Sequence, residues 1–349
     1  MDTPIELYKW KRKQRNIQKV YASKYAFVGI GNHSLHNLYP VVDYLRVPLK
    51  YIVCKSQRSV DLVKQNYIAL TATNDYDETL NDGEIKGVFI CANPNSHFEL
   101  ALKALRAKKN VFVEKPVCLS SGDLESLISA EKESGSFCTV GMQKRYSTCT
   151  SILKKRLKKD NLLSYNYRFQ VGAYPEGNPY WDIFIHPVDW LIFLFGKARI
   201  LSVVETNHGK GRLSVMLHLK HDADLVGSVE ISTEYGWSLP LEELSVNTEK
   251  GVYEMRNHQL LTYTTKPDTF LSIPTEKILP FTTEKQYLFD GNNFLPVFQN
   301  NQLVLQGYFV EIQTFVDQCE GKKANNLSSL ESLRDTYHIL EQIQNQNPK

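Results

Sequence analysis

The first 140 residues alternate short apolar runs with longer stretches of helical periodicity. The runs end at glycine, proline or polar residues and cover residues 25–30, 50–54, 87–91, 110–113 and 137–140. An apolar run of this length without alternation is typical of a strand buried on both faces of a parallel sheet. Between the later runs, residues 96–107 and 122–133 have the length and pattern of helices. We therefore expect repeated βα units that form a doubly wound parallel sheet, in the α/β Rossmann class.

The second half of the chain has a different pattern, in which apolar and polar residues alternate. The alternating stretches cover residues 200–205, 212–219, 225–232, 243–247 and 252–256. Alternation of this kind predicts an open, mostly antiparallel sheet with one buried face. Residues 308–318 and 328–344 have the periodicity of amphipathic helices. These signals together predict a C-terminal α+β domain.

The two patterns divide the chain into three segments. We expect residues 1–24 to form a polar, basic N-terminal extension, residues 25–144 a parallel-sheet domain of the Rossmann class, and residues 145–349 the α+β domain. The extension fits either a helical arm packed on the domain or a solvated leader, and its density of lysine and arginine favours the second.

Composition and charge narrow the class of protein. A hydrophobic content of 42% and a charged content of 23% belong to an ordinary globular protein. The net charge of +3 is too small to indicate a nucleic acid or an anionic membrane as the main partner. The apolar runs are too short to span a bilayer, and the N-terminus lacks the apolar core of a signal peptide, so we expect a cytoplasmic protein. The six cysteines are scattered, which favours buried free thiols over disulfides or a metal site.

A glycine-rich turn follows the first strand. Gly29-x-Gly31-x-x-Ser34 opens a helix directly after residues 25–30, which is the context that a dinucleotide fingerprint needs. Gly29 permits the tight turn, and Gly31 lets the backbone approach a pyrophosphate at the helix N-terminus. Ser34 is small enough to stand where a third glycine often sits. We expect this turn, with Asn32 and His33, to hold the pyrophosphate.

The end of the second strand carries basic residues where an NAD site usually carries an acid. Such sites place Asp or Glu there to bond the ribose 2′-hydroxyl and repel a 2′-phosphate. This chain has Lys55, Ser56 and Arg58, which would pair with a phosphate dianion. The alternative is a solvated basic turn that contacts no ligand. We predict NADP as the preferred cofactor, with NAD as the alternative.

The run at residues 110–113 leads directly into Glu114, Lys115 and Pro116. In open α/β sheets, ligands bind outside the carboxyl ends of the strands, where this charged pair falls. Taken alone, a solvated strand end is the favoured interpretation, because charged residues usually face water. We expect a cis peptide bond before Pro116, which would aim the Lys115 side chain.

Five pieces of sequence, in this order, resemble the Gfo/Idh/MocA family of NAD(P)-dependent oxidoreductases, which is named for glucose-fructose oxidoreductase and inositol dehydrogenase. The pieces are residues 29–34, 91–97, 114–116, 141–146 and 182–189. The resemblance extends from about Tyr25 to the C-terminus. It implies hydride transfer between a nicotinamide cofactor and the hydroxyl or carbonyl carbon of a sugar, nucleotide sugar or cyclitol. Two departures, Phe184 in place of a frequent glycine and a reduced glycine run at residues 177–181, leave the substrate class open.

The resemblance also implies a catalytic group of Lys115, Asp182 and His186, which we expect to bind substrate as well. Oxidation of a carbinol needs a base for the hydroxyl proton and a group that holds the oxygen. Asp182 and His186 are four residues apart, so a helix would place them on one face. In this hypothesis Lys115 polarises the hydroxyl, His186 accepts its proton and Asp182 positions both, although either Lys115 or His186 fits the role of base. We expect Asp189, three residues further on, to be structural.

The remaining site residues follow from the same resemblance. We expect Asn93, Pro94 and Asn95 to border the nicotinamide ribose and Glu114 to hold that end of the cofactor. The other cofactor or substrate contacts that we expect, each with core packing as its alternative, are Gln143, Arg145, Tyr174, Tyr180 and Trp181. His97 fits either the site or a packing role in its helix.

Two other functions share this fold. A dinucleotide-binding regulator would have no need of Lys115, Asp182 and His186, and a glycosidase acting through bound NAD would release a sugar without net change of the cofactor. We expect small-molecule substrates and a homodimer or homotetramer formed through the C-terminal sheet.

Overall fold

A six-stranded parallel sheet forms the N-terminal part of the computed structural model, which describes residues 2–17, 21–67, 70–222, 224–267, 269–278, 280, 283–291 and 297–345. The strand order is β3-β2-β1-β4-β5-β6, with every pairing parallel. The strands are β1 (Lys24–Val28), β2 (Leu49–Val53), β3 (Thr71–Thr73), β4 (Ile85–Ile90), β5 (Asn110–Glu114) and β6 (Cys138–Gly141). The expected doubly wound sheet is confirmed.

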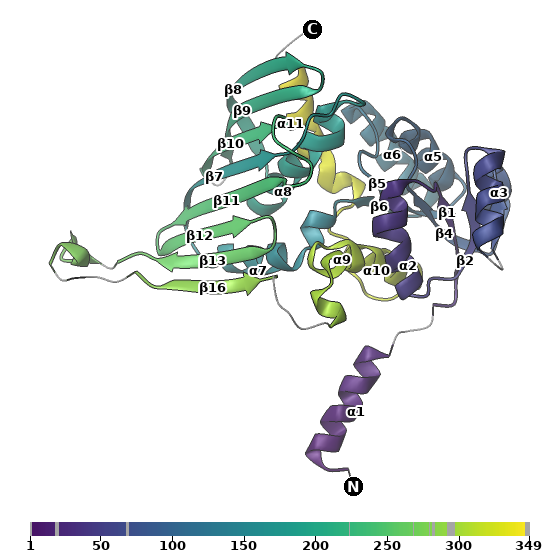
Figure 1. Ribbon diagram of the computed structural model, residues 1–349, viewed down its shortest axis with the longest axis horizontal. Coiled ribbons are helices and arrows are strands. Elements are labelled where there is room, and N and C mark those ends of the chain that lie inside the picture. Colours follow the sequence, from purple (N-terminus) through teal and green to yellow (C-terminus); the bar gives the residue numbers. More distant parts are fainter. Residues whose placement is uncertain are drawn as a thin grey trace.

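Helices cover both faces of this sheet, which is why its strands are apolar throughout (Figure 1). They are η1 (Ser34–Leu38), α2 (Tyr39–Tyr44), α3 (Gln57–Asn66), α4 (Tyr76–Asn81), α5 (Pro94–Arg106) and α6 (Ser121–Ser134). Phe27, Phe89 and Phe112 are fully buried and form a continuous row across the sheet, with ring centroids 5.6 and 5.7 Å apart.

The C-terminal part is built on an eight-stranded sheet in the order β16-β13-β12-β11-β7-β10-β9-β8. Only the β7–β10 pairing is parallel, so the sheet is mixed but mostly antiparallel, as the alternation predicts. Its strands are β7 (Leu162–Gln170), β8 (Ala198–Gly209), β9 (Arg212–His221), β10 (Val226–Ser232), β11 (Leu241–Thr248), β12 (Gly251–Arg256), β13 (Leu260–Thr265) and β16 (Lys285–Asp290). A separate short hairpin pairs β14 (Thr269–Phe270) with β15 (Ile273–Pro274).

One face of the eight-stranded sheet packs on helices, and the other is open. The helical segments of this half are η2 (Gln143–Tyr146), α7 (Thr148–Leu157), η3 (Tyr180–Phe184), α8 (Ile185–Phe195), η4 (Thr275–Lys277), η5 (Phe298–Asn300), α9 (Gln302–Leu305), α10 (Tyr308–Cys319), η6 (Leu330–Leu333) and α11 (Arg334–Asn345). In Figure 1, α8 and α11 lie between this sheet and the N-terminal half. Apolar residues from both sheets share one continuous core, so the two halves are packed together.

Helix α10 belongs to the second half by sequence but packs on the first sheet. Ile312, Phe315 and Val316 are fully buried in the cluster that contains Phe89 and Phe112. The chain therefore returns to the nucleotide-binding half after completing the second sheet.

Helix α1 (Pro4–Asn16) stands apart from the body of the molecule (Figure 1). It begins with a capping box in which Thr3 and Glu6 satisfy each other's backbone N–H groups. Residues 2–14 are all exposed, so this part of the extension is a solvated helix and not an arm packed on the domain. Within the described ranges, no helix is long and apolar enough to cross a membrane, and all six cysteines are free thiols.

Candidate active site

The glycine turn after β1 forms an open cradle at the carboxyl edge of the parallel sheet. Gly29 has φ +105°, and a side chain there would overlap the Cys91 carbonyl, so only glycine fits this turn. A side chain at Gly31 would meet nothing within 4 Å, so this part of the backbone is open to a ligand. The buried Ser34 hydroxyl accepts a hydrogen bond from the Gly31 N–H at 3.0 Å and stabilises the turn. The geometry fits the predicted pyrophosphate site, where Asn32 and His33 are exposed.

The loop after β4 reaches the same edge. Asn93 caps α5 by accepting a hydrogen bond from the Asn95 N–H at 3.1 Å, and Pro94 occupies the first turn. His97 is buried, with Nδ1 2.8 Å from the Pro116 carbonyl and Nε2 3.1 Å from the Ala92 carbonyl. His97 therefore joins the loop after β4 to the turn after β5, which is the packing role foreseen for it.

Glu114 ends β5 with its carboxylate buried beside the cradle. Its Oε1 lies 3.4 Å from His33 Nε2, and its Oε2 accepts from the Lys115 N–H at 3.3 Å. Gly141 on β6 leaves room for it, because a Cβ there would lie 2.9 Å from the carboxylate. Burial raises the pKa of Glu114, but His33 and Lys115 outweigh burial and lower it, so the side chain is an anion.

Lys115 extends from the strand end toward the C-terminal half. The peptide bond to Pro116 is cis, as expected. The Lys115 ammonium donates to the Asp182 backbone carbonyl at 2.6 Å. Burial lowers the pKa of Lys115, although Glu114 and Asp182 oppose this effect. A lysine with a lowered pKa at a ligand-binding edge is suited to proton transfer or to polarising an oxygen.

Asp182 lies in the π-helical turn η3, which leads directly into α8, where His186 lies. π-Helical turns often occur at functional sites. The Asp182 carboxylate accepts a hydrogen bond from the Asn178 N–H at 3.0 Å, and a side chain at Gly177 would overlap it. Its carboxylate therefore holds the preceding loop, while its carbonyl holds Lys115.

His186 follows Asp182 by four residues and lies near the start of α8. In the described part of the chain, its ring makes no hydrogen bond to protein, and it is only partly buried. Burial lowers the pKa of His186 well below its usual value, and the positive charges of Lys115 and Lys144 lower it further. The imidazole is therefore neutral at physiological pH and free to accept a proton.

Arg145 has a structural position instead of the predicted substrate contact. Its guanidinium forms a bidentate ion pair with Asp189, with Nε 2.8 Å from Oδ2 and Nη2 bonded to Oδ1. The remaining N–H groups donate to the Leu327 carbonyl and to the Ser332 hydroxyl and carbonyl. Because all five donors of this buried side chain have partners, none is left for a ligand. Asp189 is structural, as expected.

The predicted aromatic walls are also engaged within the protein. Trp181 is buried and donates to the Gln344 side chain at 3.1 Å. Tyr180 bonds Glu205, and the buried Phe184 packs edge-to-face on it at 5.7 Å. Tyr174 is half-buried, and its ring and the Asp182 carboxylate both border Gly177.

The remaining cofactor predictions fall on residues that are exposed or half-buried. Lys55, Ser56 and Arg58 are exposed after β2, where Ser56 caps α3 through the Ser59 N–H at 3.3 Å. Gln143 opens η2 and is half-buried.

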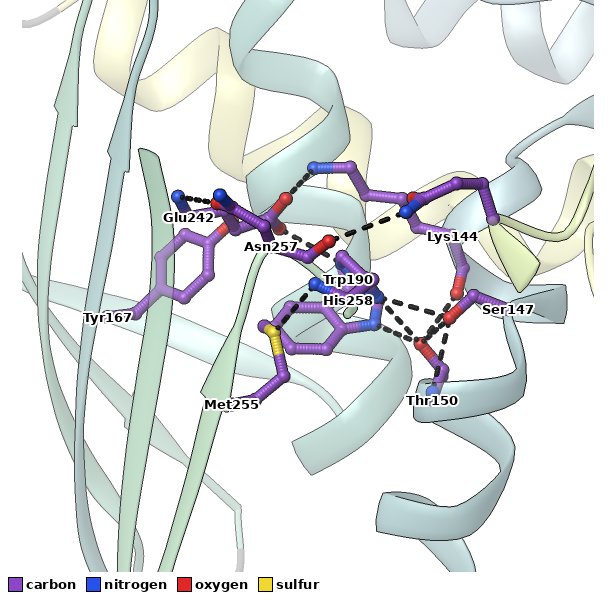
Figure 2. Close-up of polar contacts among 10 residues, drawn as sticks. Lys144, Ser147, Thr150, Tyr167, Trp190, Glu242, Met255, Asn257 and His258 are labelled. Carbon is purple, nitrogen blue, oxygen red and sulfur yellow. Dashed lines mark hydrogen bonds and ion pairs between the residues drawn. The ribbon is translucent and has the colours of Figure 1, made fainter. Parts of the chain in front are cut away.

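A buried polar network beside the site was not predicted from the sequence (Figure 2). Glu242 on β11 pairs with Lys144, and its Oε1 accepts from Tyr167 at 2.7 Å and from His258 at 3.2 Å. Burial raises the pKa of Glu242, but Lys144 and His258 outweigh it and lower the pKa strongly. The alternation of residues along the strand could have indicated that Glu242 is buried. Glu242 lies on the core-facing side of β11 together with Leu244 and Val246.

Ser147, His258 and Glu242 are connected in the same way as the serine, histidine and acid of a hydrolase triad. His258 lies 3.2 Å from Glu242 and 3.1 Å from Ser147. However, Ser147 and His258 are both fully buried, so no substrate reaches the hydroxyl. We therefore interpret the arrangement as structural. Within the described ranges, no group of three His, Cys, Asp or Glu side chains is placed to bind a metal.

Comparisons with known proteins agree with this geometry. Residues 23–142 match the model of an oxidoreductase family with an NAD-binding Rossmann fold. The chain is 31% identical over 142 residues to the oxidoreductase YhhX of Escherichia coli, covering 38% of this chain and 41% of that relative. It is 25% identical over 264 residues to an inositol 2-dehydrogenase/D-chiro-inositol 3-dehydrogenase of Lactiplantibacillus plantarum, covering 68% and 72%. A levoglucosan dehydrogenase solved with NADH and L-sorbose shares the fold, with TM-score 0.76, 15% identity and coverage of 93% and 96%.

Proposed function

The chain belongs to the Gfo/Idh/MocA family of oxidoreductases, and we propose that it interconverts a hydroxyl and a carbonyl group on a sugar, nucleotide sugar or cyclitol. The observation that carries the proposal is the position of Lys115, which follows Glu114 at the edge of the parallel sheet and donates to the Asp182 carbonyl of the second half at 2.6 Å. Lys115 comes from the end of a parallel strand and His186 from a helix of the other half, and the Asp182 carbonyl holds the lysine between them. The inositol and levoglucosan dehydrogenases named above support this substrate class.

In the proposed mechanism, two side chains act on one oxygen. The Lys115 ammonium donates to the oxygen on the reacting carbon and stabilises negative charge that develops there. The neutral His186 accepts the hydroxyl proton during oxidation and returns it during reduction. Asp182 orients Lys115 through its carbonyl and holds the 177–178 loop through its carboxylate.

The residues at the sheet edge fit a nicotinamide dinucleotide, which would supply the hydride acceptor or donor. The glycine turn supports this fit. Gly29 tolerates no Cβ, and a Cβ on Gly31 would point into open space where a cofactor could approach the backbone. Apart from its ion pair with His33 Nε2 at 3.4 Å, the buried Glu114 Oε1 has no hydrogen-bond partner among the described residues, so it retains acceptor capacity beside the cradle. The exposed Lys55 and Arg58 favour a 2′-phosphate, so we propose NADP as the preferred form.

The experiment is a screen for cofactor reduction. Purified protein is incubated with NADP⁺ or NAD⁺ and with myo-inositol, levoglucosan, D-glucose or UDP-N-acetylglucosamine, and reduced nicotinamide is followed by absorbance. We expect reduction with at least one substrate and a loss of about a hundredfold or more in single-turnover rate for His186→Asn. An unchanged rate in His186→Asn would exclude it as the base. Cofactor binding without reduction would indicate a regulator, and release of free sugar without net reduction would indicate a glycosidase.

The open face of the second sheet supports a proposal on assembly. Leu201, Val204 and Met216 on β8 and β9 are exposed there at 45, 64 and 50%. An exposed apolar sheet face is typical of an interface, so we propose that two or four copies associate through it. Sedimentation velocity of the wild type and of Val204→Glu/Met216→Glu tests this, since a wild-type monomer would exclude it.

A further inference from the structure

A cavity borders the loop that the Asp182 carboxylate holds. Its volume is about 750 Å³, which is in the range of small-molecule sites. Its walls come from three parts of the chain, namely the loop before η3 (within residues 174–180), the β8–β9 hairpin (within residues 205–213) and the end of α11 (residues 344–345). All three lie outside the five segments that resemble the family.

Hydrogen bonds through Asp182 join this cavity to the catalytic group. The Asp182 carbonyl accepts from the Lys115 ammonium at 2.6 Å, and its carboxylate accepts from the N–H of Asn178, a wall residue, at 3.0 Å. At the other end of the same loop, the Tyr174 N–H donates to the Gly211 carbonyl of the hairpin at 3.0 Å. The loop is therefore held at both ends, so a ligand would enter a preformed cavity.

Three amide side chains in the walls each accept a hydrogen bond, through oxygen, from an N–H group of the protein. They are Asn178 (from Tyr180, 3.0 Å), Asn207 (from Gly209, 2.9 Å) and Gln344 (from Trp181, 3.1 Å). Because only the oxygen of an amide side chain accepts, these bonds fix which way each amide is turned. Each NH₂ group has no partner among the described residues, which leaves it able to donate to a ligand.

The charged side chains of the walls add further donors. Arg212 gives one N–H to the His208 carbonyl at 3.1 Å, and Lys210 makes no ion pair or hydrogen bond with the described residues. Glu205, the one acidic side chain among the described wall residues, already accepts from the Tyr180 hydroxyl. The cavity therefore presents N–H donors on three amides and two cations, whereas its acidic side chain is engaged.

We propose that this cavity is a subsite for a phosphate or another oxyanion that the substrate carries away from its reacting carbon. The inference rests on the proposed function and narrows its substrate class to sugars or cyclitols with such a group, including nucleotide sugars. An ionised oxyanion has several acceptor lone pairs and no donor, which matches a wall of free N–H groups. Lys210 and Arg212 would make some of these bonds charge-assisted, and such bonds are about twice as strong as neutral ones.

The first test compares compounds with and without an anionic group. The pairs are D-glucose with D-glucose 6-phosphate, myo-inositol with myo-inositol 1-phosphate, N-acetylglucosamine with UDP-N-acetylglucosamine, and D-glucose with D-glucuronate. Calorimetry measures binding to the protein saturated with reduced cofactor, which excludes phosphate from the cofactor site and prevents oxidation of these alcohols. We expect at least one anionic compound to bind about 10-fold or more tightly than its neutral counterpart. The pair that shows this effect separates a phosphomonoester, a diphosphate and a carboxylate.

The second test replaces free donors without breaking the hydrogen bonds of the walls. Asn207→Asp and Gln344→Glu keep the oxygens that accept from Gly209 and Trp181, and they put a charged oxygen in place of the NH₂ group. We expect each variant to weaken binding of the selected anionic compound by about 10-fold or more, because a lost donor is replaced by a like charge. Unchanged binding in both variants would overturn the proposal.

The third test removes the cations, which are exposed, in Lys210→Met/Arg212→Met. The matched control is Arg199→Met/Lys220→Met, which takes the same charges from register partners at the far end of the same two strands. We expect the ratio of the two affinities, anionic over neutral, to fall to near one in the first variant and to stay at the wild-type value in the control. Circular dichroism checks the fold of each variant, and if one variant does not fold, the others decide by the same criteria.

The outcomes separate this proposal from the proposed function. Oxidation of neutral sugars with no gain in affinity from any anionic group would agree with the function and overturn the subsite. Selective binding of an anionic compound that the protein never oxidises would contradict the function and leave the subsite supported. If no anionic compound binds more tightly than its neutral counterpart, or if the third test leaves the ratio unchanged, the subsite proposal is wrong.

Discussion

Lys115 with Asp182 and Arg145 with Asp189 are two pairings of a basic and an acidic residue, drawn from three of the family-like segments of the sequence. In the first pair, the lysine bonds the Asp182 backbone carbonyl, and His186, four residues further on, has no hydrogen-bond partner in the described part of the chain. In the second pair, all five N–H donors of the arginine are bonded. Their acceptors are the Asp189 carboxylate, the Leu327 carbonyl, and the hydroxyl and carbonyl of Ser332. The difference shows that a charged residue in a family-like motif is available to a ligand only if its donors are left free.

Burial alone does not separate the two groups. Both sit between the halves of the molecule, and desolvation acts on each. What separates the two groups is whether all hydrogen-bond donors of the charged side chain have partners in the protein. A fully paired ion contributes to the folded structure. An incompletely paired ion has a lowered or raised pKa and remains available to a ligand. The predictions below test this contrast, beginning with the largest effect.

Replacement of Lys115 by methionine should abolish most of the activity of the first group. We expect the single-turnover rate of hydride transfer to fall about a thousandfold or more, because the reacting oxygen loses its charged donor. Thermal unfolding should change little, since the lysine bonds one carbonyl. Rapid-mixing absorbance measurements on the cofactor-loaded protein check the rate, and a rate within tenfold of wild type would contradict the assignment.

Replacement of Arg145 by methionine should have the opposite signature. Removing one partner of a buried ion pair leaves Asp189 uncompensated, so we expect a loss of about 3–5 kcal/mol in the free energy of unfolding. Denaturant titration measures this loss, and Asp189→Leu in the Arg145→Met background should recover part of it. A stable Arg145→Met protein with weakened substrate binding would instead support the substrate contact expected from the sequence.

Lys55→Asp extends the contrast to the cofactor edge, where the basic side chains are exposed and free. The substitution removes a phosphate partner and adds a carboxylate that bonds a ribose hydroxyl. We expect the ratio of kcat/KM for NADP to that for NAD to fall by about a hundredfold. Steady-state kinetics with both cofactors measures it, and a native preference for NAD would show that the basic turn contacts no phosphate.

The smallest expected effect concerns Glu311 on α10. Its side chain is fully buried, and neither carboxyl oxygen has a hydrogen-bond partner among the described residues. Burial and the charge of Glu114 raise the pKa of Glu311 well above its usual value. The folded state therefore keeps a proton that the unfolded state releases above about pH 4.3, and the wild type loses stability as pH rises toward the folded-state pKa.

Glu311→Gln keeps the shape and removes this titration. We expect the variant to be more stable than the wild type by about 1 kcal/mol at pH 8, with the difference vanishing near pH 4. Denaturant titrations across this pH range, without cofactor, measure it. Parallel stability curves for the two proteins would show that Glu311 has the same protonation in both states.

The local pattern of the sequence was enough to predict most of the fold. Continuous apolar runs became strands covered on both faces, and alternating runs became strands covered on one face. It also predicted Gly29 in a positive-φ turn and Lys115 at the end of β5, because both depend on the chain within a few residues. Helix α10 was predicted as a helix, but its packing on the first sheet was not, since periodicity does not identify the opposing surface.

The sequence by itself determined which segments are strands and helices and which chemical groups stand at their ends, because these follow from backbone preferences and side-chain spacing. The tertiary structure alone decided which charges are satisfied. Arg145 is paired across 44 residues to Asp189, and Lys144 across 98 residues to Glu242. Whether a buried donor is free depends on partners that only long-range packing brings within bonding distance, and short-range patterns carry no information about them.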